Sequence, residues 1–361
     1  MPRRTLPIRQ RRDGAWEVRY RDASGRQRST TKRSEAAARR FLTETRADLA
    51  RGVWIDPNDA STTFRTYAED WRQRQIGAYG TRVAIENSLR VHWYPLLGNV
   101  PLERLRPSML QGAVRSLEGR LAASTIHTVV QHLRQVLNGA VADRMIATNP
   151  ADGLKLPRVE RSELVIPSPE QVAAIAVAID DRHRALVVVG AGLGLRQGEA
   201  FGLSRDRVDF LRRRVTIDRQ LVREEHGSTL GPLKTSNSYR TIPLPSWAGD
   251  ELARHLERYP NDDPDGLLFV APMGGRLRRD GWNRRVWKPA VTAAGRAELG
   301  YHSLRHFYAS ALIRRGLQAP VVAERLGNTA AMVWDTYAHL WKDDDDRTRE
   351  AIDELFGRRA S

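Results

Sequence analysis

The chain has 361 residues, a formal net charge of +16, 41% hydrophobic residues and no cysteine. This length suffices for two or three domains, and the charge favours a polyanionic partner, with nucleic acid ahead of a membrane. The lack of cysteine excludes a disulfide framework and thiolate metal sites, and it agrees with a reducing cytosol.

The sequence has no pattern typical of a membrane span or a signal peptide. Its longest apolar run, residues 185–189, is far too short to cross a bilayer. The N-terminus is charged and is not followed by an apolar region. We therefore expect no membrane partner and a location in the cytoplasm.

Residues 1–56 form a strongly basic segment with the pattern of a small sheet and a helix. They contain 15 Lys and Arg against 7 Asp and Glu. Alternation at residues 16–20 and a second run at 26–32 predict strands that follow a first one near the N-terminus. Residues 35–51 predict a helix capped by Ser34.

This segment is expected to bind DNA through its charge and a Trp/Tyr face, although a merely solvated basic face is the alternative. The candidate contacts are basic or aromatic residues of the three strands and their turns. They are Arg9, Arg11, Arg12, Trp16, Arg19, Tyr20, Arg28 and Lys32.

A linker at residues 55–59 precedes a region, residues 62–157, in which every pattern is helical. Helices are expected at 66–71, at 82–91 with an end before Pro95, at 107–117, and after a cap at Ser124. The last has an apolar stripe at helical spacing. These helices predict a compact bundle, joined by a basic tether to a third domain at 165–361, which begins at a cap on Ser168.

Residues 185–194 look at first like a strand that enters a glycine-rich phosphate loop. The dinucleotide pattern fails because Gln197 stands where the last glycine should be, and no Walker lysine follows. We expect a buried helix that ends at the glycines, then a new helix near Arg196. Short strands follow, one at 215–218 and one that closes after a polar turn, which places Lys234 near a hairpin tip.

His302 and Arg305 are three residues apart, so a helix projects both from one face. A titratable donor beside a guanidinium suits a phosphate whose charge rises during a reaction. Tyr337, 32 residues after Arg305, offers a hydroxyl that can attack the phosphate. Each piece alone is more often structural than functional.

Together these pieces resemble a known family. Residues 195–203, Lys234, residues 302–306, Leu326-Gly327 and residues 337–340 occur in the order seen in tyrosine recombinases of the phage integrase type. The resemblance covers the whole chain and is strongest at 168–340. It implies a multidomain, mainly α protein with an arm-binding sheet and helix, a core-binding bundle, and an α-rich catalytic domain with a small antiparallel sheet.

The resemblance also implies the site residues. Tyr337 would attack the scissile phosphate and form a 3′-phosphotyrosyl link, while Arg196 and Arg305 grip the non-bridging oxygens. Lys234 would protonate the leaving 5′ oxygen, and His302 would assist proton transfer. Glu199 would hold the loop of the first arginine in place, and His339 is expected to have a structural role.

One position departs from the family pattern: Asn328 follows Leu-Gly where the family has His or sometimes Trp. An amide can still donate a hydrogen bond to phosphate, but it cannot exchange a proton near neutral pH. We expect Asn328 to keep a positioning role, with reduced but not abolished chemistry.

The chemistry needs neither metal nor other cofactor, because two arginines can stabilise the charge on phosphate and the tyrosyl ester conserves the bond energy without ATP. The expected function is site-specific DNA recombination by an integrase of a phage or mobile element. Its expected partners are double-stranded DNA at core and arm sites, further subunits in a homo-tetramer, and an excisionase or DNA-bending factor. A type IB topoisomerase-like enzyme and a non-catalytic DNA-binding protein with a decayed site are the alternatives.

Overall fold

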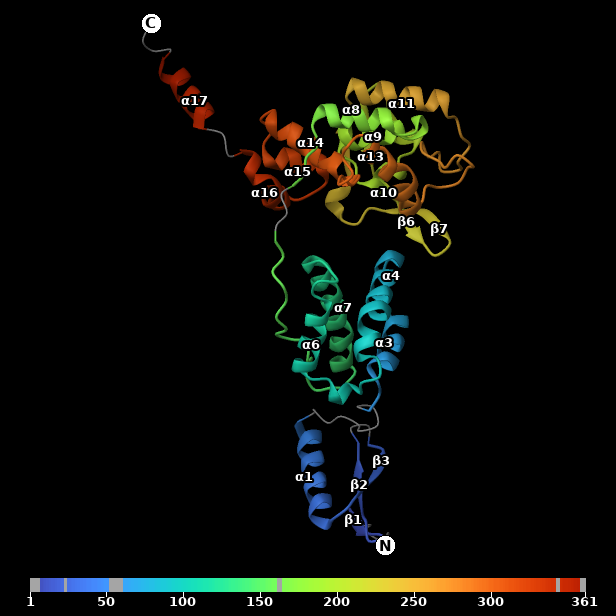
Figure 1. The fold of residues 1–361 in the computed structure, drawn as a ribbon, viewed down its shortest axis with the longest axis vertical. Helices are drawn as coiled ribbons and strands as arrows, with labels where there is room; N and C mark the ends of the chain where they lie inside the picture. The colour runs from blue at the N-terminus through green and yellow to red at the C-terminus, as the bar shows by residue number, and fades with distance from the viewer. Residues whose placement is uncertain (1–6, 23–24, 52–60, 161–163, 342–344, 358–361) are drawn as a thin grey trace. The chain divides into compact units, whose positions relative to one another are not determined.

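The computed structural model describes residues 7–22, 25–51, 61–160, 164–341 and 345–357. The chain divides into two compact units, residues 1–161 and 162–361 (Figure 1). The predicted linker at 55–59 lies outside the described residues. Within the described ranges, no helix has both the length and the apolar character needed to cross a bilayer.

The first unit begins with an antiparallel sheet of three strands, β1 (Ile8–Gln10), β2 (Trp16–Arg21) and β3 (Gln27–Lys32), in that order. Helix α1 (Glu35–Arg51) follows, and the Ser34 hydroxyl accepts a hydrogen bond from the Ala37 amide at 3.2 Å, as the predicted cap requires. The predicted strands and helix are therefore confirmed.

The aromatic face of this sheet packs on α1, so the expectation that it lies along a DNA groove is wrong for this arrangement. Trp16 and Tyr20 share a face of β2 with the buried Val18, and all three belong to the small core under the helix. Tyr20 meets Phe41 of α1 edge-to-face at 5.6 Å, and the Lys32 ammonium lies 4.1 Å from the same ring. The alternation of strand residues then places Arg9 and Arg19 on the opposite face.

The second part of this unit is a helical bundle. It consists of α3 (Phe64–Gln73), α4 (Tyr79–Ser88), a π-helical turn (Leu89–Trp93), α5 (Tyr94–Leu97), the 3₁₀ turn Leu102–Arg104, α6 (Pro107–Leu117) and α7 (Ala123–Ala142). The predicted apolar stripe of α7 is buried, and the indole nitrogen of Trp93 donates to the Val129 carbonyl at 2.9 Å.

Two predicted boundaries in the bundle are wrong. The helix expected at 82–91 does not close before Pro95 but continues through the π-helical turn to Leu97. Proline lacks an amide hydrogen and its ring crowds the carbonyl four residues earlier, and a wider turn is one way to accommodate both. Ser124 lies inside α7, whose cap position is Ala122.

The second unit is built around the buried helix α9 (Asp181–Leu193), which contacts α8 (Pro169–Ala178), α10 (Gln197–Phe201), α11 (Ser246–Arg258) and α14 (His302–Arg314) (Figure 1). Ser168 forms the predicted cap of α8. A Cβ on Gly190 would lie 2.7 Å from Leu304 Cδ1, so this glycine lets α9 and α14 approach closely. The rejected phosphate loop is thus a buried helix that ends at Gly194, as predicted.

Two small antiparallel sheets flank these helices. One has the order β4 (Val208–Asp209), β5 (Arg214–Ile217), β8 (Arg240–Pro243), and the other pairs β6 (Arg219–Glu224) with β7 (Gly227–Pro232). The 3₁₀ turns Arg205–Arg207 and Ser236–Ser238 precede β4 and β8. The β6–β7 hairpin turns at Glu225-His226, so the expectation that Lys234 lies near a hairpin tip is wrong. Lys234 follows β7, on the connection to β8.

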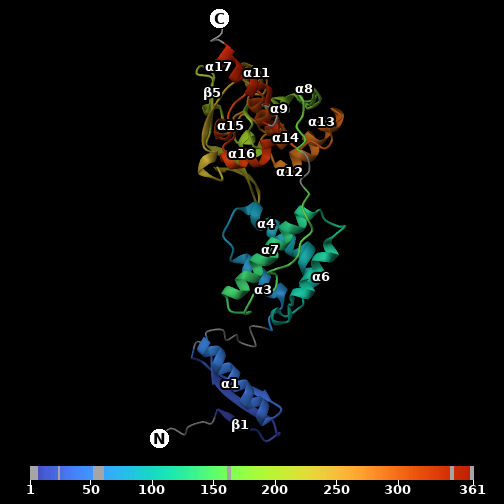
Figure 2. The same ribbon diagram turned by 90° about the vertical axis from the view of Figure 1, so that its left-hand side faces the viewer.

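The remaining helices are α12 (Arg279–Trp282), a π-helical turn (Asn283–Trp287), α13 (Lys288–Ala293), α15 (Ala319–Leu326), α16 (Ala330–Tyr337), the 3₁₀ turn Ala338–Trp341 and α17 (Asp345–Gly357). Helices α14, α15 and α16 lie together (Figure 2). Their buried residues form a separate apolar cluster that includes Tyr337. This cluster fixes the tyrosine beside α14.

A substitution at Gly202, at the end of α10, tests the close packing between α10 and β6. A Cβ there would lie 2.8 Å from the Leu221 amide nitrogen and 2.9 Å from the Gln220 carbonyl carbon, and backbone cannot step aside as a flexible side chain can. We expect Gly202→Ala to lower the free energy of unfolding by about 1–3 kcal/mol, as overpacking does. Urea denaturation of the full chain measures this change.

Gly249→Ala is the matched control, because the new Cβ inside α11 would lie an ordinary 3.5 Å from Leu244 Cδ2. Alanine there is expected to raise the free energy of unfolding by roughly 0.5–1 kcal/mol through helix propensity. Equal unfolding midpoints for the two variants would contradict the packing described here.

Candidate functional site

The candidate site lies in the second unit, where residues far apart in the sequence meet at helix ends. Arg196 is the cap residue of α10, Arg305 belongs to the first turns of α14, and Asn328 follows α15. Tyr337 is the last residue of α16. The structure therefore brings together Arg196, Arg305 and Asn328 in direct hydrogen bonds, with Tyr337 close by.

Arg305 is buried despite its charge, with only 2% of its surface accessible. Its Nη1 donates to the Gly194 carbonyl at 2.7 Å and its Nη2 to the Leu326 carbonyl at 2.6 Å. These carbonyls end α9 and α15, where the last carbonyls of a helix have no partner within it and carry partial negative charge. Burial, and then Arg196, lower the pKa of Arg305 to about 9.

Asn328 bridges the two arginines. Its Oδ1 accepts from Arg196 Nη2 at 2.6 Å and from Arg305 Nη2 at 3.1 Å. Guanidinium groups only donate, so the amide oxygen must be the atom that faces them. The predicted positioning role thus has a geometric basis, through acceptance of two hydrogen bonds rather than donation of one.

Gly327 places Asn328 at this point. It ends α15 with a left-handed φ of 62°, and a Cβ there would lie 2.9 Å from Ser238 Cα. Its carbonyl accepts from Arg196 Nη2 at 3.2 Å. A residue with a side chain would therefore be strained at this position and would push apart the loop next to Arg196.

Glu199 supports the arginines from behind. Its carboxylate accepts from the Arg196 backbone at 3.0 Å, from Arg196 Nη1 at 2.8 Å and from Arg240 Nη2 at 2.8 Å. Burial would raise the pKa of Glu199, but Arg240 and Arg196 outweigh it and hold this pKa below its ordinary value. The structure places Glu199 against both the backbone and the side chain of Arg196, and its supporting role stays a prediction.

Arg240 is a residue that the sequence reasoning missed. Its side chain is 3% exposed, and it also donates to the carbonyls of Ser238 and Arg325. A basic residue at an inward position of the alternating strand β8 was the available signal. Arg196 and Arg240 share the Glu199 carboxylate, and Arg305 lies in the same cluster, so its three guanidiniums exceed its one carboxylate by two positive charges.

Tyr337 is 3% exposed, and its hydroxyl lies 2.7 Å from Nδ1 of His306. Burial raises the pKa of Tyr337 to about 12, although Arg305 counteracts this. Burial, His302 and Arg305 together lower the pKa of His306 to about 4. His306 is therefore neutral at ordinary pH, and in the tautomer that carries its proton on Nε2 the Nδ1 atom accepts the phenolic hydrogen.

His306 was also missed, although it follows Arg305 directly in the motif. The available signal was its spacing of four from His302, which puts both rings on one face of α14. The rings meet edge-to-face with centroids 4.7 Å apart. His302 keeps an exposed side. Partial burial of its ring, and then Arg305 and Arg196, lower the pKa of His302.

Two predicted residues lie at the edge of the site. Lys234 is exposed, in the loop whose Thr235 and Ser238 hydroxyls share a hydrogen bond at 2.9 Å. Ser238 Oγ in turn lies 3.5 Å from Arg196 Nη1, so this loop borders the arginine cluster. His339 is exposed in the turn after Tyr337, and its structural role stays a prediction.

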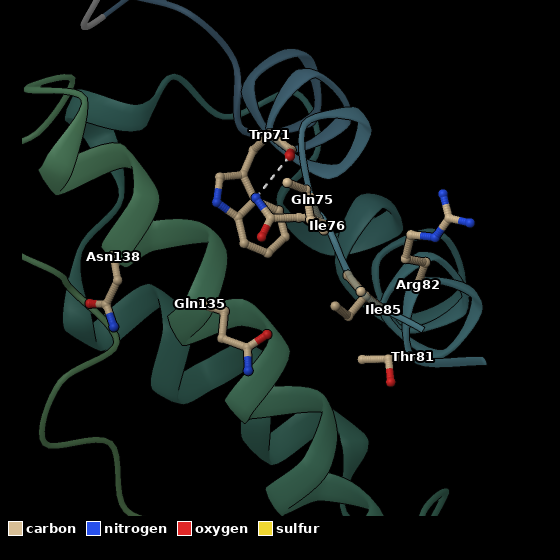
Figure 3. A pocket seen from close by; sticks show the side chains of 9 residues that line it. Trp71, Gln75, Ile76, Thr81, Arg82, Ile85, Gln135 and Asn138 are labelled. Atoms are coloured by element: carbon tan, nitrogen blue, oxygen red, sulfur yellow. Dashed lines mark hydrogen bonds between the residues drawn. The ribbon is translucent and has the colours of Figure 1, made fainter. Parts of the chain in front are cut away.

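A separate cavity of about 430 Å³ lies in the bundle of the first unit, between α3, α4 and α7 (Figure 3). Trp71 and Ile85 form its apolar wall, while Gln135 and Asn138 of α7 face it. Arg82 is the one charged residue among those that line it. The cavity therefore lacks a pair of groups for acid–base chemistry, and the arginine cluster is the better candidate for a reaction.

Each of the two units matches a known protein family model. Residues 168–343 match the model of the phage integrase family, and residues 64–156 match that of the phage integrase central domain. The prophage phiRv2 integrase of Mycobacterium tuberculosis is 27% identical over 352 residues, which cover 93% of this chain and 91% of that protein.

Solved structures show the same fold. A Tn1549 transposon integrase in complex with a circular intermediate DNA has a TM-score of 0.69 at 22% identity, over 82% of this chain and 100% of that one. A lambda integrase tetramer bound to a Holliday junction has a TM-score of 0.55 at 16% identity, over 92% and 96% of the two chains. The chain therefore belongs to the phage integrase family of tyrosine recombinases.

Proposed function

We propose that this protein is a site-specific DNA recombinase of a phage or other mobile element, and that it cuts and rejoins DNA through Tyr337. One observation carries this proposal. A tyrosine hydroxyl lies beside a cluster with two excess positive charges, in which the buried Arg305 is held by carbonyls. Such a cluster suits an anion with several oxygens, and the phosphodiester is the anion that a basic chain meets on DNA.

The arginines would hold the scissile phosphate. Arg196 and Arg305 already converge on one oxygen, Oδ1 of Asn328, at hydrogen-bond distance. A non-bridging phosphate oxygen entering the site would take that place, and the amide would turn so that its NH₂ group donates to the phosphate. Charge that grows on these oxygens during attack is then stabilised by groups already in position.

Tyr337 would attack the phosphorus and remain joined to the 3′ end of the broken strand. The 5′ oxygen leaves, and Lys234, on the loop that borders Arg196, would protonate it. His302, on the exposed side of the arginine cluster, would assist proton transfer. The tyrosyl ester keeps the energy of the broken bond, so a 5′ hydroxyl can reverse the step without ATP.

The basic N-terminal sheet would bind arm sites. Arg9 and Arg19 lie on the face of the sheet opposite α1, and Arg11 and Arg12 are exposed in the β1–β2 turn. Arg28 and Lys32 lie on the helix side of β3 and would reach only the edge of a groove. Phosphate contacts from these groups would give binding that weakens steeply with salt.

Strand exchange requires several protomers on paired sites, and we extend the proposal to a homo-tetramer. The apolar residues Ile352, Leu355 and Phe356 of α17 are each at least half exposed, which suits docking on a neighbouring subunit. The chain would act on the bacterial nucleoid, and an excisionase or a DNA-bending factor would set the direction of recombination there.

Tyr337→Phe should abolish covalent attachment to DNA and leave DNA binding intact, because only the nucleophilic oxygen is removed. Nicked duplexes that carry the crossover sequence trap the attached strand, and denaturing gels detect it. Tyr308→Phe removes another half-buried phenol nearby on α14 and should keep full activity.

Wild-type protein that binds its site yet forms no adduct would favour the non-catalytic alternative. Relaxation of a supercoiled plasmid without a crossover site would favour a type IB topoisomerase. Either result contradicts the proposed function.

Asn328→Asp should hold Arg196 and Arg305 in ion pairs that compete with the phosphate. A carboxylate in place of the amide would pair with both guanidiniums and neutralise charge that the phosphate needs. We expect adduct formation to fall roughly 10²–10³-fold, the cost of losing one oxyanion donor, while the free protein unfolds at a higher temperature. Asn237→Asp adds the same charge at an exposed position in the neighbouring loop and should change the rate far less. Equal effects of the two variants would refute the role of Asn328.

Glu199→Gln should destabilise the second unit at neutral pH, by about 3–5 kcal/mol as expected when one partner of a buried ion pair is removed. The folded-state pKa of Glu199 is lowered, so its contribution is present above its unfolded value of 4.5 and is lost as pH falls through the folded value. The difference in urea midpoint between wild type and variant should therefore shrink at low pH. Glu324→Gln, which breaks an exposed ion pair with Arg325, should have little effect at any pH.

A further inference from the structure

We propose that His306 accepts the phenolic proton of Tyr337 when the tyrosine attacks the phosphate. This inference rests on the proposed function and assigns a further catalytic residue to the same site. Its basis is the hydrogen bond of 2.7 Å between the Tyr337 hydroxyl and Nδ1 of His306, which joins the reacting oxygen to a base.

The position of His306 is set by its neighbours rather than by chance packing. It follows Arg305, whose guanidinium is locked to the ends of two other helices. The edge-to-face contact with His302 fixes the plane of the imidazole, and its ring centroid lies 5.8 Å from that of Tyr337. α14 therefore presents Nδ1 to the hydroxyl before any substrate arrives.

The other groups of the site are poorly placed to take this proton. The arginines only donate hydrogen bonds, and the carboxylate of Glu199 is engaged by Arg196 and Arg240. Lys234 is assigned to the leaving oxygen and must be protonated for that task. His302 touches the His306 ring, whereas His306 touches the reacting oxygen itself.

The timing of the transfer follows from the two pKa values. The pKa of Tyr337, about 12, is far higher than that of His306, about 4, so no free phenolate forms in the resting site. The proton passes as the bond between Oη and phosphorus forms, because the phenol becomes acidic at that moment. The negative phosphate also offsets Arg305 and His302, the groups whose charge lowers the basicity of His306.

The step balances in atoms and charge. The Oη–P bond forms and the bond between phosphorus and the 5′ oxygen breaks. The phenolic proton moves to Nδ1 of His306, which becomes imidazolium, while Lys234 protonates the 5′ oxygen. In rejoining, the imidazolium returns its proton to Oη as the tyrosine leaves, so the same residue serves both directions.

The test compares His306→Asn with wild type on nicked duplexes that carry the crossover sequence, with the rate of covalent attachment as readout. The Asn oxygen can occupy the place of Nδ1 and keep the hydrogen bond, but it is not basic. We expect attachment to slow by about 10²-fold or more, the usual contribution of a general base, with DNA affinity unchanged. Tyr308→Phe controls for the packing of α14.

A duplex with sulfur in place of the leaving 5′ oxygen separates base from acid, because a thiolate leaves without protonation. With this substrate, the rate of covalent attachment should return toward the wild-type rate for Lys234→Ala but stay low for His306→Asn. If this substrate restored the attachment rate of His306→Asn, the residue would act on the leaving group and the proposal would be overturned. Attachment by His306→Asn at the wild-type rate on the normal duplex would also overturn it.

His306→Ala is the second variant, in case Asn disturbs the fold. Added imidazole should increase its attachment rate at least about tenfold and should have no effect on Tyr337→Phe. Lack of rescue in a variant that still binds DNA would overturn the assignment. Wild-type protein that forms no adduct would overturn the proposed function together with it, whereas an active wild type with an equally active His306→Asn overturns only this inference.

Discussion

The site depends on a guanidinium that is buried without a carboxylate of its own. Arg305 is 2% exposed, and the acceptors it contacts are the carbonyls of Gly194 and Leu326 and the amide oxygen of Asn328. Burying an unneutralised cation is costly, and the lowered pKa of this arginine reflects that cost. Partial charges at the ends of α9 and α15 offset it in part. The part of the Arg305 charge that these partial charges do not offset attracts an anion.

The fold supplies these carbonyls through two glycines in the left-handed region. Gly194 ends α9 at a φ of 64°, and Gly327 ends α15 at 62°. Each stops its helix one residue after the last turn and turns the chain aside, so that terminal carbonyls face the arginines instead of water. The same turn at Gly327 brings Asn328 over both guanidiniums. Helix termination and anion binding are therefore one structural feature here.

Sequence patterns predicted this fold and most of this site for identifiable physical reasons. The stripe of α7, the caps at Ser34 and Ser168 and the buried α9 depend on periodicity and on local hydrogen bonds, which neighbouring residues determine. The predicted arginines and tyrosine belong to short motifs whose order along the chain carries information. Family resemblance then assigned roles that no single motif could have supported.

What the sequence did not reveal depends on contacts between distant segments. Arg240 binds Glu199 across 41 positions, and Tyr337 meets His306 across 31. No periodicity reports such a pair. The burial of Trp16 against α1 depended on which face of the sheet the helix covers, and alternation along a strand leaves that choice open. The π-helical turn before Pro95 likewise required knowledge of how the bundle packs around it.

Asn328 holds two guanidiniums through a side chain that does not exchange a proton near neutral pH. A neutral amide oxygen accepts from both guanidiniums and bridges them without cancelling their charge, whereas a carboxylate would cancel it. An amide can also turn and donate, but it cannot carry a proton between groups. The proposed mechanism therefore leaves proton transfer to other residues, and α14 carries two imidazoles, His302 and His306, on one face. The proposed mechanism thus assigns positioning to residue 328 and proton transfer to the histidine pair on α14.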